Sequence, residues 1–209
     1  MAWLRSSGIW LALAALLLLP AVAMAKGEKT DPDEAKQYLE TLGNDALSIL
    51  GDNSVDLATR EDKVRTLMED NLDLQLIGRF VLGRHWREAS PEQREEYLEL
   101  FEEFVLQTYT RRLGGYSGQS FKVTSARPVG KRGDALVDTE ITEQGAQPIK
   151  AGWRVKTTNG EKRIVDVMVE GVSMAATQRS EFDAIVRRDG VGGLIEVLKV
   201  KVTKAPAQS

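Results

Sequence analysis

Few residues in this sequence have the chemistry of a catalytic site. The 209 residues include no cysteine and one histidine, so any pair of a nucleophile and a histidine must use His85. His85 lies beside Trp86, between a glycine and the next expected helix. A lone histidine in such a place more often packs or forms hydrogen bonds than acts as a base. Gly78 and Gly83 have the spacing of a phosphate-binding loop, but the lysine that must follow them is absent.

The carboxylates are numerous, but their spacing does not predict a metal centre. The densest run is Glu95, Glu96, Glu99, Glu102 and Glu103. It lies on an expected helix, where such a run is typical of a solvated face. A metal would need clustered histidine, cysteine or carboxylate ligands. We therefore expect no metal, no cofactor and no enzymatic activity.

The beginning of the chain has the pattern of an export signal in residues 1–25. Arg5 is followed by an apolar run from Ile9 to Leu19 and by the small-residue cleavage site Ala23-Met24-Ala25. The run is too short to be a good membrane span, and no second long apolar run follows. We therefore expect an exported protein that is soluble after cleavage.

The charge balance excludes some partners. The whole chain has a net charge of −3, and residues 1–25 contain one arginine and no acid, so the remainder carries −4. A nucleic-acid partner would require a basic footprint, which this balance argues against. It also argues against electrostatic attachment to an anionic bilayer.

Apolar residues with helical spacing predict three helices before the middle of the chain. The first runs from Pro32 to Leu50, and the second begins at about Thr59. The third begins at Ser90-Pro91, where Gln93 completes a capping box, and ends near Leu113. Its apolar arc is roughly 180° wide, against about 100° for a helix that covers one core. Either this helix is buried from two sides, or one side lines a cavity.

Four strands are expected next, at Ser120–Ala126, Asp134–Thr142, Ile149–Thr157 and Glu161–Glu170. Asn159-Gly160 is the strongest hairpin signal between them. Period-2 alternation predicts an antiparallel meander with one solvated face. The expected inward residues are Phe121, Val123, Val137, Ile141, Ala151, Trp153, Val155, Val165, Val167 and Val169. The expected outward residues are Lys122, Lys150, Arg154, Lys156 and Asp166.

The sheet is expected to lead directly into a helix from Ser173 to Arg188. Gly171 ends the last strand, and Ser173 can cap the helix. A polar Gln178 falls inside the apolar stripe of this helix. After a turn at residues 189–193, a short closing helix is expected at residues 194–200. One domain thus spans residues 26–203: a helical part at about 33–119, a sheet at about 120–170 and C-terminal helices at about 173–200, before a polar tail at residues 204–209.

Several segments together resemble the MlaC family of periplasmic phospholipid-binding proteins, also called the toluene-tolerance auxiliary family. They are Phe80-Val-Leu-Gly-Arg-His-Trp86, Ala89-Ser-Pro-Glu-Gln-Arg-Glu95, Tyr116-Ser-Gly-Gln-Ser-Phe121, Val169-Glu-Gly-Val-Ser-Met174 and Arg179-Ser-Glu-Phe182. The resemblance covers roughly Ala35 to Leu198 and is weakest before about Asp70. It implies an α+β fold, in which a twisted antiparallel sheet of about four strands and several helices enclose a deep apolar cavity, as in NTF2-like and MlaC-like proteins.

The same resemblance implies a monomeric carrier whose cargo is phospholipid. Its implied partners are an inner-membrane ABC transporter complex with an MCE-domain protein and an outer-membrane lipoprotein–porin complex. Its implied role is lipid transport that maintains outer-membrane lipid asymmetry. A related subfamily linked to hopanoid lipids is an alternative, as are an adaptor without ligand and an NTF2-like enzyme. The enzyme would need Asp138 or Glu140 to point inward with a raised pKa, whereas the alternation places Val137, Thr139 and Ile141 there.

We predict that the lipid contacts apolar side chains from the helices and the sheet, together with Gln178. Gln178 would then meet the lipid near its ester level, whereas the alternative is that it bonds a buried backbone group. The predicted lipid-binding residues are Phe80, Leu82, Trp86, Tyr97, Phe101, Phe104, Val105, Tyr109, Trp153, Val167, Val169, Val172, Met174, Gln178, Phe182 and Ile185.

Overall fold

The computed structural model describes residues 28–113, 118–143 and 145–203. The expected export signal and the polar tail lie outside these ranges. The quoted segment from Tyr116 to Phe121 begins outside them. The helices are α1 (Pro32–Leu50), α2 (Leu57–Asn71), α3 (Leu74–Leu82), the 3-10 helix η1 (Gly83–Arg87), α4 (Pro91–Leu113) and α5 (Met174–Thr203). The strands are β1 (Ser120–Val129), β2 (Asp134–Thr142), β3 (Ile149–Thr158), β4 (Glu161–Val169) and β5 (Val172–Ser173).

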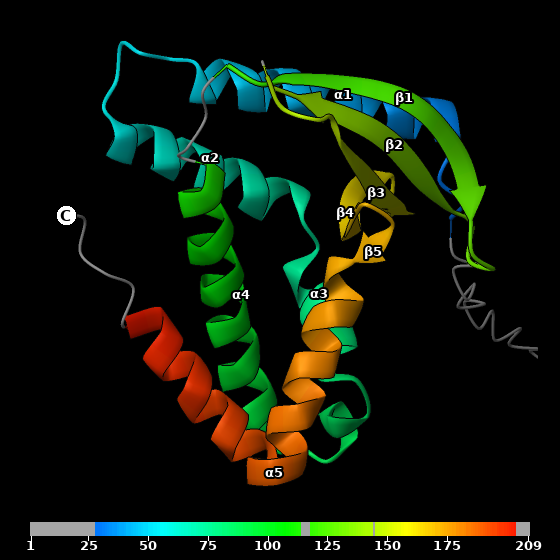
Figure 1. Cartoon of the computed structure of the whole chain (residues 1–209). Coiled ribbons are helices and arrows are strands. Elements are labelled where there is room, and N and C mark those ends of the chain that lie inside the picture. The colour runs from blue at the N-terminus through cyan, green and yellow to red at the C-terminus, as the bar shows by residue number, and fades with distance from the viewer. Residues whose placement is uncertain (1–27, 114–117, 144, 204–209) are drawn as a thin grey trace, which may run out of the picture.

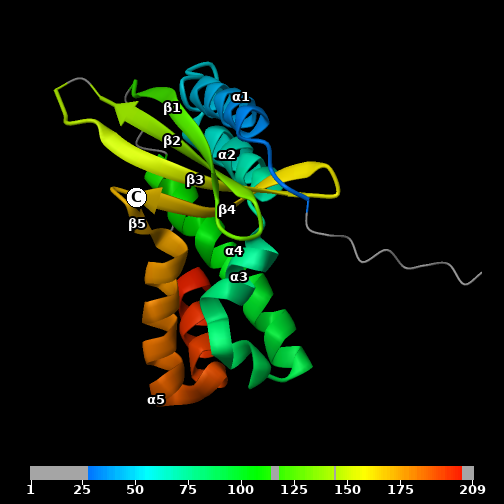
Figure 2. The same ribbon diagram turned by 90° about the vertical axis from the view of Figure 1, so that its right-hand side faces the viewer.

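The fold has a sheet half and a helical half, which confirms the α+β prediction. The five strands form one antiparallel sheet in the order β1-β2-β3-β4-β5. Helix α1 packs along β1 and β2, while α3, α4 and α5 extend away from the sheet (Figures 1 and 2). In the described ranges, no helix is both long and apolar enough to cross a membrane.

The hairpin signal at Asn159-Gly160 and the capping box at Ser90 are confirmed. Asn159 and Gly160 both have positive φ, 53° and 80°, as the two central residues of a tight hairpin require. At the start of α4, the Ser90 backbone N–H donates to the Gln93 side chain, and the Gln93 N–H donates to Ser90 Oγ. This reciprocal pair is the predicted capping box.

The main differences from the predicted element bounds are at α2, β1 and α5. Helix α2 begins at Leu57 rather than Thr59, because Asp56 is the N-cap and accepts from the Thr59 N–H. Strand β1 continues to Val129, past Pro128, which is tolerated because β1 is an edge strand. The expected turn at residues 189–193 is a single break at Gly190 (φ 72°, ψ 177°) within α5.

The expectation that Val165 points inward with Val167 and Val169 is wrong. Strand β4 contains a bulge, so Val155 pairs with Ile164 while Arg154 pairs with Asp166, and Val165 is the extra residue. Ile164, which is 1% exposed, therefore takes the core position. A bulge of this kind shifts every later side chain by one place, and no glycine in the strand marks it.

The described residues form two separate hydrophobic cores rather than one. The helical core contains Tyr97, Phe101, Phe182 and Leu194 with their neighbours from α3, α4 and α5. The sheet core contains Leu39 of α1 packed on inward strand residues such as Val137 and Ile164. A domain usually has one contiguous core. The space between these two cores is therefore the place to look for a site.

Candidate functional site

The apolar face of α4 is ordinary core at Tyr97 and Phe101. Tyr97 and Phe101 are 0% and 1% exposed, and their rings stack on each other with centroids 5.8 Å apart. Phe182 of α5 meets both rings edge-on at 6.4 Å. The Tyr97 hydroxyl donates to the Gly78 carbonyl at 3.0 Å, and burial raises the pKa of this hydroxyl. Tyr97, Phe101, Phe182 and the equally buried Leu82 leave no surface for a ligand, so we assign them to the core.

Further along α4 the apolar side chains become accessible. Phe104 and Val105 pack against the helical core, yet both are only partly buried, as is Tyr109 one turn later. Phe104 lies beside Phe182 at 6.2 Å, at the edge of the aromatic cluster. Helix α4 makes its extensive backbone contacts with α2, α3 and α5, and among the described residues the sheet is not one of these partners. The accessible end of this face is therefore not covered by direct packing on the sheet.

The inward face of β3 and β4 carries the matching set of partly buried apolar residues. Trp153 pairs with Val167 across the two strands, and Ala151 pairs with Val169. The Trp153 indole N–H donates to Thr139 Oγ1 at 2.9 Å, and Thr139 Oγ1 donates to the Ala151 carbonyl at 3.1 Å. The polar atoms of this surface are thus satisfied within the sheet. The other side chains that this face of β3 and β4 carries, such as Val167 and Val169, are apolar.

Helix α5 connects the two surfaces, because it packs on α4 and, near its beginning, on β4. Met174 and Ile185, from this helix, are also partly buried. We group the partly buried apolar residues of α4, α5 and the sheet that the sequence predicted to bind lipid under the name junction site. Its members are Phe104, Val105, Tyr109, Trp153, Val167, Val169, Met174 and Ile185.

The corner between the sheet and α5 is fixed by Asp166, which the strand alternation predicted to lie on the solvated face. The Ser173 hydroxyl donates to Asp166 Oδ2 at 2.6 Å, and the Ala175 N–H donates to Asp166 Oδ1 at 3.2 Å. Ser173 Oγ accepts from the Ala176 N–H at 3.0 Å, which confirms it as a cap. Asp166 therefore anchors the first turn of α5 to β4, and this sets the wall of the junction site. Its position seven residues before Ser173 gave no signal, because a tight turn at Glu170-Gly171 brings them together.

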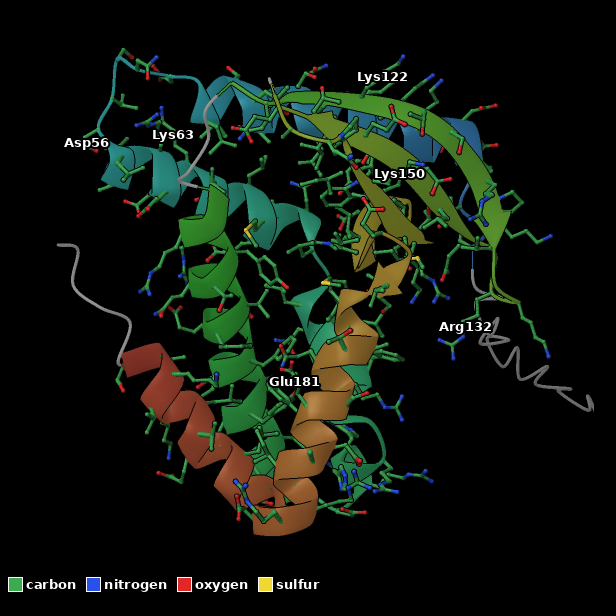
Figure 3. All side chains as sticks on the ribbon, in the orientation of Figure 1. Asp56, Lys63, Lys122, Arg132, Lys150 and Glu181 are labelled. Atoms are coloured by element: carbon green, nitrogen blue, oxygen red, sulfur yellow. The ribbon has the colours of Figure 1, made fainter. Side chains whose placement is uncertain are left out.

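Gln178 does not bond a buried backbone group, so that alternative is wrong. Its side-chain amide donates to Glu181 Oε2 at 3.0 Å, on the exposed part of α5 (Figure 3). Two predicted lipid contacts also lie on the surface: Phe80 is 45% exposed and Val172 is 54% exposed. The guanidinium groups of Arg79 and Arg94 both lie over the Trp86 ring, at 5.0 and 5.4 Å from its centroid. We leave Phe80, Trp86 and Val172 out of the junction site.

The candidate catalytic groups are engaged elsewhere. His85 is buried, with Nδ1 2.6 Å from Glu88 Oε2 and Nε2 2.8 Å from Asp183 Oδ1. Burial alone would lower the pKa of His85, but the hydrogen bonds to these two carboxylates outweigh it and raise the pKa. His85 thus joins η1 to α5 as a structural ion pair. In the described part of the chain, no group of histidine and acidic residues could hold a metal ion.

The strand carboxylates expected of an enzyme do not line the core face of the sheet. Val137 and Thr139 are 0% and 2% exposed on that face. Asp138, between them in the chain, accepts a hydrogen bond from Ser125 Oγ at 2.7 Å and lies 3.8 Å from the Arg127 guanidinium. This ties its carboxylate to β1 on the other face.

The sequence and the fold also resemble those of known proteins. The family model described as MlaC protein matches residues 40–200. The intermembrane phospholipid transport system binding protein MlaC of Haemophilus influenzae is 29% identical over 139 residues, covering 63% of this chain and 65% of that protein. The toluene tolerance protein ttg2D of Pseudomonas putida is 27% identical over 131 residues, covering 62% of this chain and 60% of that protein. The chain thus spans less than two thirds of the length of these curated relatives.

A solved structure shares the fold. It is a phospholipid-binding protein from Ralstonia solanacearum in complex with a phospholipid, and it superposes with a TM-score of 0.71. The match covers 82% of this chain and 98% of that one, at 23% sequence identity.

Proposed function

Because this chain belongs to the MlaC family, we propose that it is a soluble periplasmic carrier of phospholipid. The acyl chains occupy the junction site, and the headgroup stays in water. The observation that carries this proposal is the set of partly accessible apolar side chains between two separate cores. The phospholipid held by the Ralstonia solanacearum protein of the same fold supports it.

The energetics of transfer explain why a carrier needs such a site. About 30 chain methylenes would cost roughly 25 kcal/mol if they were exposed to water, at ~0.8 kcal/mol each. That exceeds the stability of a typical domain, about 5–15 kcal/mol. The lining must therefore be almost as apolar as a bilayer interior, whereas burying the charged headgroup would only add a cost. A lining whose Trp153 N–H is already satisfied within the sheet meets this requirement.

The finer parts of the proposal rest on family membership. The carrier works as a monomer and moves lipid between an outer-membrane lipoprotein–porin complex and an inner-membrane ABC transporter complex with an MCE-domain protein. This transport maintains the lipid asymmetry of the outer membrane. It breaks no covalent bond, so it needs neither catalytic groups nor a cofactor. Gln178 lies at the rim of the lining, near the lipid esters.

Native mass spectrometry of the exported protein, purified without added lipid, tests the proposal. We expect one diacyl phospholipid per chain, identified after extraction by lipid mass spectrometry. Recovery of a hopanoid would keep the carrier but change its cargo. Repeated preparations that are folded, stable and free of lipid would contradict the proposal.

A further inference from the structure

Three arginine side chains converge on a surface pocket of the helical half, away from the junction site. The pocket has a volume of about 370 Å³ and is lined by Leu82, Arg84, Arg179, Ser180, Asp183 and Arg187. Helix α5 supplies Arg179, Asp183 and Arg187 at four-residue spacing, which places them on one stripe of the helix. Arg84 comes from η1. We call this the arginine pocket.

The arginine pocket carries more positive charge than the protein itself neutralises. Asp183 is its single acidic residue, and it already accepts from Arg84 at 3.0 Å and His85 at 2.8 Å and forms an ion pair with Arg187 at 3.2 Å. Arg179 has no carboxylate within ion-pair distance in the described part of the chain, and its guanidinium lies over the Phe80 ring at 5.2 Å. Three guanidinium groups thus line the pocket around one carboxylate, and only two of them pair with it. This excess stands out in a chain whose net charge is −3.

The contacts of Asp183 also hold the pocket in shape. His85 beneath it is 6% exposed and is fixed by Glu88 on its other nitrogen. Arg84 and Arg187 are therefore positioned from η1 and α5 around a fixed acid, and Arg179 is left free to meet a ligand. A positioned guanidinium binds carboxylates in a bidentate manner and loses little side-chain freedom in doing so.

The surface beside the pocket is apolar in a way that suits a protein partner. Phe80 is 45% exposed next to Arg179. Arginine and aromatic side chains are enriched at the centres of protein interfaces. An extended anionic bilayer would be repelled by the rest of an acidic chain, whereas a short segment meets only the local positive field.

We infer that the arginine pocket docks an acidic segment of a partner protein, with carboxylates on Arg179 and its neighbours and an apolar side chain on Phe80. The inference rests on the proposed function only in that a carrier must dock to deliver its cargo. It uses no residue of the junction site. Lipid loading and docking can therefore be measured separately on the same samples.

The test measures fluorescence anisotropy of labelled nonapeptides, each with several Asp or Glu residues around one Phe or Leu, mixed with the full exported chain. Matched peptides with Asn and Gln in place of the acids are the peptide control. Arg179→Gln is the main variant, because Arg179 makes no ion pair that the fold would lose. We expect it to weaken acidic-peptide binding about tenfold, which corresponds to about 1.4 kcal/mol.

The matched protein control is Lys122→Gln, which removes the same charge from β1 in the sheet half, well above Glu181 of α5 in the view of Figure 3. It should change peptide binding by less than about twofold, because exposed charges beyond a Debye length are screened. Arg179→Lys keeps the charge but removes the planar fork, so it should restore binding only in part.

Three outcomes would overturn the inference. The acidic set could bind no better than the neutral set, or wild type and Arg179→Gln could bind it equally. Alternatively, phosphatidylglycerol vesicles could bind through Arg179 while the peptides do not, which would assign the pocket to membrane headgroups. Bound lipid, measured in each sample by mass spectrometry, should be unchanged in Arg179→Gln, so that a failure of docking is distinguished from a failure of the carrier proposal.

Discussion

His85 is the residue whose role changes most between the sequence and the structure. It is the one histidine in the chain, and it lies between two carboxylates instead of beside a nucleophile. Because both ring nitrogens face carboxylate oxygens, the charged form is favoured and the pKa is raised. The chain has no cysteine, so few other groups titrate near neutral pH. The stability of the protein should therefore report on His85.

We predict that the melting temperature falls as the pH rises through the folded-state pKa of His85. The raised pKa means that the stabilisation is fully present below about pH 6.5, the ordinary value, and is lost above the raised value. Thermal melts from about pH 6 to about pH 9 measure this fall. His85→Gln should lack the step. The same pH dependence in both proteins would show that His85 is not its source.

Asp166 shows what the residue pattern could not reveal. Alternation along β4 predicted a solvated acid, and the structure makes it the anchor of Ser173 and Ala175. Asp166→Ala should cost about 1–3 kcal/mol, because it leaves two donors at the start of α5 without their acceptor. Chemical denaturation measures the loss. Asp45→Ala, at an exposed site on α1, should stay within about 0.5 kcal/mol of wild type. If Asp166→Ala and Asp45→Ala both changed the stability by equally small amounts, Asp166 would not anchor α5.

At the scale of elements, the sequence predicted most where the signal is local. The hairpin at Asn159-Gly160, the capping box at Ser90 and the bounds of α1 depend on a few adjacent residues, and all are confirmed. The bulge at Val165 and the cap at Asp56 were missed. A bulge is decided by how two strands pair, which no single strand encodes. Asp56 and Thr59 can each cap the start of this helix, and in the structure Asp56 is the N-cap.

The packing of α1 on the sheet gives a second prediction at this scale. Gly43 of α1 lies directly beneath the Phe121 ring of β1, so an added Cβ would overlap that ring. Gly43→Ala should be destabilising, because overpacking costs about 1–3 kcal/mol and outweighs the gain of about 1 kcal/mol in helix propensity. Thermal melts measure the sign of the change.

The same substitution at Gly192 provides the opposite control. Gly192 lies in the last part of α5, and an added Cβ would come no nearer than 3.9 Å to Gln93. Gly192→Ala should therefore stabilise the protein by about 0.5–1 kcal/mol. If Gly43→Ala raised the melting temperature as Gly192→Ala does, α1 would not be as close to β1 as described.

At the scale of the whole molecule, the sequence predicted the fold class but not the division of its core. The wide apolar arc of the Ser90–Leu113 helix fitted both a buried helix and a cavity wall, and the structure divides it. Tyr97 and Phe101 are core, while Phe104 and Val105 remain partly accessible. Helical periodicity gives the direction of a side chain, but it cannot say where along the helix direct packing on neighbours ends. The point where this packing ends depends on how far the sheet and α5 lie from the helix.

Our main proposal is that the junction site holds the acyl chains. It is tested most directly by the lipid content of Val169→Asp, measured by native mass spectrometry alongside circular dichroism. An unpaired charge among acyl chains is costly, so Val169→Asp should be folded and empty. Leu57→Asp, which adds the same charge at an exposed position on α2, should be folded and loaded like the wild type. A Val169→Asp protein that is folded and fully loaded, or one that is unfolded while Leu57→Asp is not, would contradict the claim.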